Sequence, residues 1–219
     1  MGTESGCNAF LHQFSIAEQM IKTGRVRNAL LVQSAGALHT CRMEDPHSAW
    51  FGDGATAVVV GPVAEGKGIL GQAHFTDGSM HDALLAGCPG RERWHDSGEP
   101  IVLYVRDREQ ARKMLMIISD VAREAVLEAL RQAGKRPEDV DFYATHQSTA
   151  WFREVTQAYI GLKNARSFDS FHWTASMQAC NIPFMLGMGE REGLLHDGDL
   201  VAMYTGGSGI VWSGMALRW

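Results

Sequence analysis

Hydrophobic positions near the start of the chain recur with the period of an α-helix. They predict a helix over 8–23, which Gly24 ends as a C-cap. The next segment, 28–35, is a continuous apolar run between turn residues, the pattern of a strand buried on both faces. Such strands favour a parallel α/β arrangement. Further strands are predicted at 55–60, 66–75, 101–105, 140–145, 166–168, 200–204 and 210–217.

The longest predicted helix covers 109–133, where an apolar stripe runs up to a capping Gly134. Shorter helices are predicted at 149–160 and 182–194, while 76–100 and 171–181 show no regular period. The succession of helix, buried strand, glycine turn and second strand occurs at 8–60 and again at 182–217. This echo suggests two similar halves packed together.

Composition narrows the class of protein. The 219 residues are 45% hydrophobic and carry a formal net charge of -5, which predicts a globular chain without an affinity for nucleic acid or anionic membranes. No apolar run approaches the ~20 residues of a spanning helix, and no basic segment followed by an apolar one marks a signal peptide. A cytoplasmic protein is expected.

The cysteines have neither the paired spacing of a zinc site nor paired histidines at finger distances, so no metal is expected and reduced thiols fit better. Cys7 differs from Cys41, Cys88 and Cys180 because it stands at the foot of the first helix. The positive end of the helix dipole favours a thiolate there, so Cys7 is either a nucleophile or a small buried residue.

Two glycine patterns, at 52–57 and 66–71, look like dinucleotide fingerprints. That motif must follow a strand and open a helix, whereas both of these lead into strands. The glycines are therefore expected to serve tight turns and close backbone approach.

His146 is a candidate catalytic residue because it directly follows the predicted strand at 140–145. Catalytic side chains of α/β folds gather at such carboxyl ends of strands. With Cys7 and polar residues in 176–181, His146 could form a thiol nucleophile, its base or oxyanion donor, and a third polar group. The alternative is a structural histidine in an ordinary core.

The motifs Ser5-Gly6-Cys7-Asn8-Ala9-Phe10, Phe51-Gly52-Asp53-Gly54-Ala55, His146-Gln147 and Gly207-Ser208-Gly209-Ile210-Val211-Trp212 occur in this order. Together they resemble the thiolase-superfamily condensing enzymes, of the ketoacyl-acyl-carrier-protein synthase III type. The resemblance implies a layered α-β-α-β-α fold, with the nucleophile half at 1–108 and the histidine half at 109–219.

The resemblance also implies a reaction. Cys7 would take an acyl group from a coenzyme A or acyl-carrier-protein thioester, with no tightly bound cofactor. His146 would hydrogen-bond the carbonyl of the second substrate, and a decarboxylating malonyl thioester would supply the attacking carbanion. The Cys7 N–H and an N–H near Gly209 would hold the oxyanion. A role in fatty acid or polyketide biosynthesis would follow.

The chain departs from the family in two places. Ser176 occupies the position of the family's asparagine, as counted forward from His146 and back from Pro183. Asn181 lies nearby, but aligning it with the family's asparagine would require an insertion in one segment and a shortening in the next. Ser176 is therefore expected at the third catalytic position, after Cys7 and His146, and Asn181 is expected outside the site. Only six residues precede Cys7, so the nucleophile half is expected to be incomplete. A homodimer, or a chain supplying the remaining strands, is then expected to cover the exposed edges.

Relatives without the asparagine suggest other outcomes. An acyltransferase to an oxygen or nitrogen nucleophile, and a catalytically silent subunit that supports a partner chain, remain alternatives to the condensing enzyme. Hydrolysis fits less well, because the family's tunnel is dry. The side chains of Met177, Phe184, Met185 and Met188 could line that tunnel, although core packing explains them better.

Overall fold

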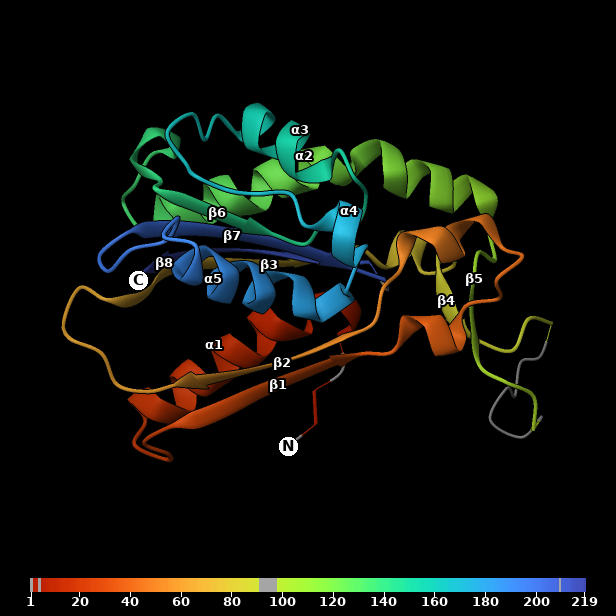
Figure 1. Cartoon of the computed structure of the whole chain (residues 1–219), viewed down its shortest axis with the longest axis horizontal. Helices are drawn as coiled ribbons and strands as arrows, with labels where there is room; N and C mark the ends of the chain where they lie inside the picture. The colour runs from red at the N-terminus through yellow and green to blue at the C-terminus, as the bar shows by residue number, and fades with distance from the viewer. Residues whose placement is uncertain (1, 4, 91–97, 209) are drawn as a thin grey trace.

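The computed structural model describes residues 2–3, 5–90, 98–208 and 210–219. Its layers follow one another as helices, sheet, helices, sheet (Figure 1). The bounds of the helices are α1 Ala9–Lys22, α2 Arg108–Gln132, α3 Phe152–Ile160, α4 Phe171–Thr174 and α5 Asn181–Arg191. The bounds of the strands are β1 Ala29–Ala35, β2 Gly54–Val60, β3 Gly68–Thr76, β4 Leu85–Gly87, β5 Val102–Tyr104, β6 Phe142–Thr145, β7 Leu200–Gly207 and β8 Val211–Arg218.

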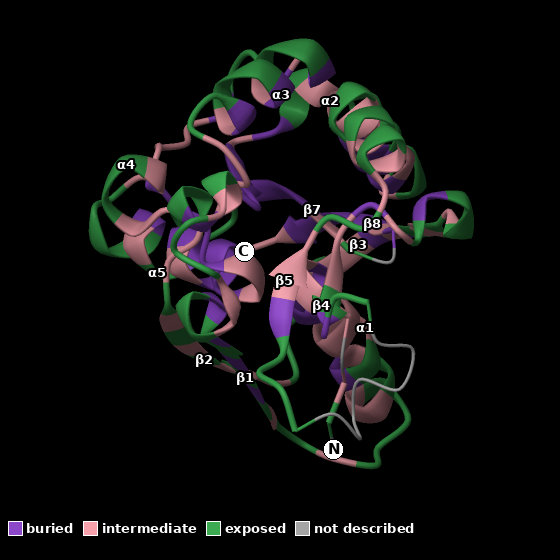
Figure 2. Cartoon of the chain, turned by 90° about the vertical axis from the view of Figure 1, so that its right-hand side faces the viewer, coloured by how far each residue is buried: buried purple, intermediate pink, exposed green. Residues whose placement is uncertain are grey.

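A four-stranded sheet in the order β3-β8-β7-β6 forms the centre of the molecule. β7 and β8 pair antiparallel, whereas β6 and β7 are parallel. Side chains on both faces of β7 are buried, and Figure 2 shows exposed residues on the outer faces of α2 and α3 and on the outlying loops. A sheet covered on both faces requires strands that are apolar at successive positions, as the run Leu200–Tyr204 is.

Two apolar clusters lie on opposite faces of this sheet. On one face α2 and α3 pack against it through residues such as Val126, Phe152 and Tyr204. On the other, α1 and α5 form a shared layer between the central sheet and β1–β2, through residues such as Leu11 and Ile182. The layered α/β fold expected from the sequence is thus present, except that no helical layer beyond β1–β2 occurs among the described residues.

The predictions for α1 and α2 are close to the structure because a glycine C-cap marks the end of each, whereas α3 begins and α5 ends three residues inside the predicted bounds, and α4 lies in a segment predicted to be irregular. α1 and α2 begin and end within one residue of the predicted bounds. Gly24 and Gly134 follow them with positive φ values of 71° and 63°, a conformation that glycine adopts without strain. The predicted strand at 166–168 is instead a single bridge between Phe142 and Arg166.

The strands predicted at 28–35 and 55–60 are present as β1 and β2, but the prediction that both of their faces are buried was wrong. They form an antiparallel pair, and their side chains alternate between the α1 side and the outer face. On the outer face Leu30, Val32 and Val59 are 63%, 54% and 71% exposed. A continuous apolar run shows that both faces suit a buried environment, but only one face is covered by the described residues.

The sheets also divide at a different place from the expected halves, 1–108 and 109–219. β3 precedes residue 108 but pairs with β8 along its whole length, so it belongs to the sheet of the carboxyl-terminal strands. The repeated succession of elements predicted at 8–60 and 182–217 corresponds to α1–β1–β2 and α5–β7–β8. Each is a helix followed by an antiparallel strand pair. Within the described residues, no helix is both long and apolar enough to cross a membrane.

Candidate active site

Cys7 lies in a short 3₁₀ turn, Gly6–Asn8, that leads directly into α1. The Thr205 hydroxyl donates to the Cys7 carbonyl at 2.8 Å, which ties this turn to the end of β7. Close approach is possible because residue 207 is glycine: a Cβ there would lie 2.9 Å from the Ser5 carbonyl oxygen and 3.4 Å from the Cys7 nitrogen. The glycine-rich end of β7 therefore sets the position of the thiol.

His146 directly follows β6, as the sequence predicts. Its backbone N–H donates to the Tyr204 carbonyl at 2.9 Å, which extends the β6–β7 pairing by one step. The side chain is 6% exposed. Burial lowers the pKa of His146 to about 4, although a hydrogen bond with Asn181 opposes that shift. The imidazole is consequently neutral at pH 7.

Ser176 is held by the Phe51-Gly52-Asp53-Gly54 turn. Its N–H donates to the Trp50 carbonyl at 2.9 Å, and its carbonyl accepts from the Gly52 N–H at 3.1 Å. A Cβ at Gly52 would lie 2.0 Å from the Thr174 carbonyl oxygen, so only glycine fits there. Gly52 thus serves close backbone approach, as expected, whereas a Cβ at Gly54 would meet the Met177 side chain. The Ser176 side chain is 2% exposed, and its hydroxyl has no partner among the described residues.

The backbone on either side of Ser176 is strained. Ala175 has φ 51° and ψ -158°, a region that glycine occupies almost exclusively, and Gln178 also has a positive φ of 50°. Strain of this kind persists only where the surroundings hold the chain in place. Here the bridges to Trp50 and Gly52 provide that support.

Asn181, expected to stand outside the site, instead contacts His146. Its Oδ1 lies 3.0 Å from His146 Nδ1, and the side chain is fully buried at the start of α5. An amide oxygen at Nδ1 favours the tautomer with the proton on Nδ1, which leaves Nε2 unprotonated in the neutral ring. Asn181 therefore orients the imidazole, while Ser176 occupies the cavity.

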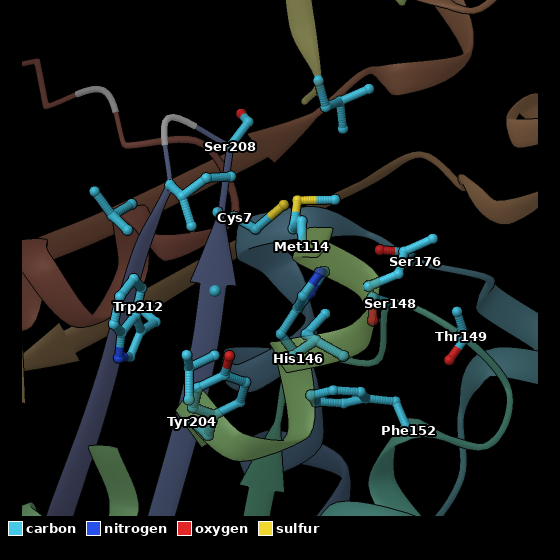
Figure 3. Close-up of a pocket in the computed structure, with 18 of the residues that line it drawn as sticks. Cys7, Met114, His146, Ser148, Thr149, Phe152, Ser176, Tyr204, Ser208 and Trp212 are labelled. Carbon is cyan, nitrogen blue, oxygen red and sulfur yellow. The ribbon is translucent and has the colours of Figure 1, made fainter. Parts of the chain in front are cut away.

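One cavity of about 130 Å³ is lined by Cys7, His146 and Ser176 together (Figure 3). The three residues come from the foot of α1, the end of β6 and the segment before α5. Gly206, Gly207 and Ile210 also line it. Gly209, the expected oxyanion position, lies outside the described residues.

Several cavity residues carry no signal that identifies them in the sequence. Met114, Ile117, Ile118 and Val121 form one wall, although their helical spacing equally predicts ordinary core packing. The sheet side and the loop after β6 contribute Tyr204, Trp212, Ser148 and Thr149. The residues considered for a tunnel lie elsewhere: Met177 and Phe184 belong to a small apolar cluster, Met185 to the α1–α5 core, and Met188 to a surface groove.

This arrangement suits acyl transfer through sulfur. A thiolate at Cys7 can attack a thioester carbonyl, and the backbone around Gly207 lies against the Cys7 N–H, where an oxyanion would form. The neutral His146 can exchange a hydrogen bond with a carbonyl oxygen in the same cavity. The apolar wall on α2 limits water near the sulfur.

Two models of one protein family match most of this chain. A model described as 3-oxoacyl-[acyl-carrier-protein] synthase III matches residues 1–78, and the model of its C-terminal part matches residues 130–219. β-Ketoacyl-[acyl-carrier-protein] synthase III 1 of Bacillus cereus is 30% identical over 220 residues, covering 100% of this chain and 66% of the relative. The chain belongs to the ketoacyl-[acyl-carrier-protein] synthase III family.

Other members and neighbours extend the likeness. The synthase III of Caldanaerobacter subterraneus is 28% identical and is covered over 65% of its length, with 98% of this chain matched. The crystal structure of the synthase III from Thermus thermophilus superposes with a TM-score of 0.86 at 24% identity, covering 98% of this chain and 66% of that one. Xanthomonas campestris OleA shares the fold, with a TM-score of 0.78 at 20% identity over 99% of this chain and 65% of that one. The chain thus spans about 65% of the length of the synthase III relatives it matches.

Proposed function

We propose that this chain is an acyl-thioester condensing enzyme of the synthase III type. Cys7 attacks the carbonyl of an acyl thioester of coenzyme A or acyl-carrier protein. The carrier leaves as its thiolate and takes up the proton of the Cys7 thiol, and the acyl group remains on sulfur. A carbanion of a second thioester then attacks this acyl carbonyl and expels the Cys7 thiolate. When that thioester is malonyl, loss of CO₂ generates the carbanion.

The observation that carries the proposal is the meeting of Cys7 and His146 in one cavity. The two residues are far apart in the sequence and reach this cavity on separate elements, α1 and β6. A silent copy of the fold would need neither side chain. Family membership supports the same reaction class, since the Bacillus cereus and Caldanaerobacter relatives are β-ketoacyl-[acyl-carrier-protein] synthases.

Acyl transfer to an oxygen or nitrogen nucleophile is the second candidate. It is favoured by Ser176, whose hydroxyl faces the cavity where the family has an asparagine amide. A hydroxyl is shorter and donates a single hydrogen bond. Removing one oxyanion donor typically lowers a rate by about 10²–10³, so the decarboxylation step would suffer more than acylation of Cys7.

A partner that covers β1–β2 is also proposed, either a second copy of this chain or a chain segment that continues the sheet. The exposed apolar side chains Leu30, Val32 and Val59 support it. Light scattering of the purified chain gives its mass in solution. A monomer that shows no association up to high concentration contradicts the homodimer.

The enzymatic proposal is tested by incubating the chain with an acyl-coenzyme A and recording the intact mass. One acyl adduct is expected, and it should be absent in Cys7→Ala. Cys41→Ala is the matched control and should retain the adduct, because Cys41 lies outside the cavity. An adduct that persists in Cys7→Ala, or none in the unmodified chain, overturns the proposal. Release of CO₂ from a malonyl thioester then separates condensation from acyl transfer.

A further inference from the structure

The cavity beside Cys7 has an apolar wall and a partly polar floor. Met114, Ile117 and Val121 of α2 form the wall. Opposite them, Tyr204 of β7 and Trp212 of β8 face the same cavity from the sheet (Figure 3). An acyl chain without polar atoms would need only the apolar wall, so the polar groups of the floor require an explanation.

The Tyr204 side chain is 1% exposed, and its hydroxyl has no hydrogen-bond partner among the described residues. Burial, together with the nearby Tyr143, raises the pKa of Tyr204 far above its usual range, so the hydroxyl keeps its proton and can donate. Tyr143 shows the usual arrangement, since its hydroxyl lies 3.1 Å from the Thr156 hydroxyl. Buried polar groups are nearly always paired, and an unpaired one that faces a cavity indicates a group supplied by a ligand.

Trp212 adds a second donor. Its Nε1 is buried and has no partner within the described part of the chain. The indole N–H can only donate, so a ligand group that satisfies it must accept. Both residues line the cavity, and the unpaired Tyr204 hydroxyl there suits an oxygen acceptor, such as a keto or hydroxyl oxygen.

The Tyr204 hydroxyl approaches the end of β7, close to the strand residue that contacts the Cys7 turn. A Cβ at Gly206 would lie 2.9 Å from the Tyr204 hydroxyl oxygen, and a Cβ at Gly207 would lie 3.4 Å from the Cys7 nitrogen. The two Cβ positions point to opposite faces of β7, but Cys7 and Tyr204 both line the same cavity, whose volume of about 130 Å³ leaves room for only a few acyl carbons beside the sulfur. An oxygen that it binds must sit near the thioester end of the acyl chain.

We propose that Tyr204 determines specificity, donating a hydrogen bond to an oxygen at the third carbon of the acyl group carried by Cys7. The enzyme then prefers 3-oxoacyl or 3-hydroxyacyl thioesters to unsubstituted acyl thioesters of the same length. This inference rests on the proposed acylation of Cys7. It assigns to the cavity a substrate class that the apolar wall alone would not select.

The test compares acylation by acetoacetyl-coenzyme A with acylation by butyryl-coenzyme A, which differ at the third carbon. Initial rates of adduct formation are measured by intact mass. The unmodified chain should prefer acetoacetyl by about 10–100-fold, the range expected when a buried polar group is left unpaired by the wrong substrate. Tyr204→Phe should abolish the preference by slowing acetoacetyl transfer alone. 3-Hydroxybutyryl-coenzyme A, run in parallel, distinguishes the hydroxyl from the keto oxygen.

Tyr143→Phe is the matched control. Tyr143 is equally buried but lies outside the cavity, so its variant should keep the preference even if it loses stability. Tyr204→Phe removes one oxygen that has no described partner, and it should melt no lower than the unmodified chain.

Adducts without a preference, or a preference that survives in Tyr204→Phe, overturn the inference and leave the proposed function intact. An equal loss of both rates in Tyr204→Phe also overturns it, because the hydroxyl would then act on the thioester carbonyl shared by both substrates. No adduct with any of the three thioesters overturns the proposed function together with this inference.

Discussion

The amide oxygen of Asn181 lies 3.0 Å from Nδ1 of His146, inside the protein and away from solvent. The pair joins the start of α5 to the end of β6. Burial lowers the pKa of His146, and because Asn181 is neutral, its hydrogen bond opposes that shift less than a carboxylate would. His146 therefore remains neutral at pH 7 and directs its other nitrogen away from Asn181.

Asn181→Asp should raise the pKa of His146 from about 4 by at least one unit, because a carboxylate close to Nδ1 favours the imidazolium. The pKa is measured by NMR titration of the histidine Cε1–H signals. His146→Gln identifies the relevant signal by its loss. A His146 pKa that stays near 4 in Asn181→Asp would show that the side chains do not interact as described.

Acid should weaken the fold through His146. In the unfolded chain this group has a pKa near 6.5 and in the folded chain about 4, so between these values the unfolded state binds more protons. The stability attached to neutral His146 is complete above pH 6.5 and is lost as the pH falls toward 4. Burial also lowers the pKa values of His12 and His74, which act in the same direction.

His146→Gln removes this contribution and leaves the other two. Between pH 7.5 and pH 5, the free energy of unfolding should fall by about 2 kcal/mol less in His146→Gln than in the unmodified chain. Urea unfolding at both pH values measures the difference. His39→Gln, at an exposed position, is the control and should keep the original slope. Equal slopes for all three proteins would refute the prediction.

Local signals in the sequence account for α1 and α2, because each combines an apolar period with a glycine at the C-cap. They do not determine which strands pair. Nothing local to β3 indicates that it joins β8, more than a hundred residues further along the chain. For the same reason the run at β1 predicts burial on both faces, although coverage depends on distant segments.

The candidate site likewise contains residues that the sequence predicts and contacts that the sequence does not reveal. Cys7, His146 and Ser176 follow from motif resemblance and offsets along the chain, and the structure brings them to one cavity. The contact between Asn181 and His146 depends on how α5 packs against β6, which no spacing reveals. An apolar stripe such as that of α2 also looks the same whether it covers a core or a cavity.

Ala175→Gly should stabilise the protein by about 1 kcal/mol. Ala175 occupies a glycine-type conformation that costs about 1–3 kcal/mol, and the greater freedom of glycine in the unfolded state offsets part of the gain. The urea midpoint measures the change. Ala158→Gly, on the exposed side of α3, is the matched substitution and should destabilise by about 1 kcal/mol. Equal losses in both variants would mean that Ala175 is unstrained.

Gly52→Ala should destabilise the protein by about 2–3 kcal/mol, since its Cβ would collide with the backbone carbonyl of Thr174 at 2.0 Å. The displacement would also reach Ser176, which pairs with the same turn. Gly187→Ala is the contrasting control, because a Cβ there meets nothing within 4 Å and alanine favours the helix α5. The urea midpoints of the two variants should move in opposite directions, and a tolerated Gly52→Ala would contradict the described bridge.

Ser176→Asn tests what the third position contributes to the proposed reaction. The Ser176 hydroxyl faces the cavity without a described partner, so a larger amide can extend into that space. An amide offers two N–H donors and a longer reach toward a developing oxyanion, and one such donor is worth about 10²–10³ in rate. Release of CO₂ from a malonyl thioester should therefore rise in Ser176→Asn, whereas Ser176→Ala should release no more than the unmodified chain. Adduct formation at Cys7 is the internal control in all three proteins, because the substitution acts on the second substrate. Unchanged CO₂ release with intact acylation would mean that the amide does not limit this step, and would favour transfer to an oxygen or nitrogen nucleophile instead.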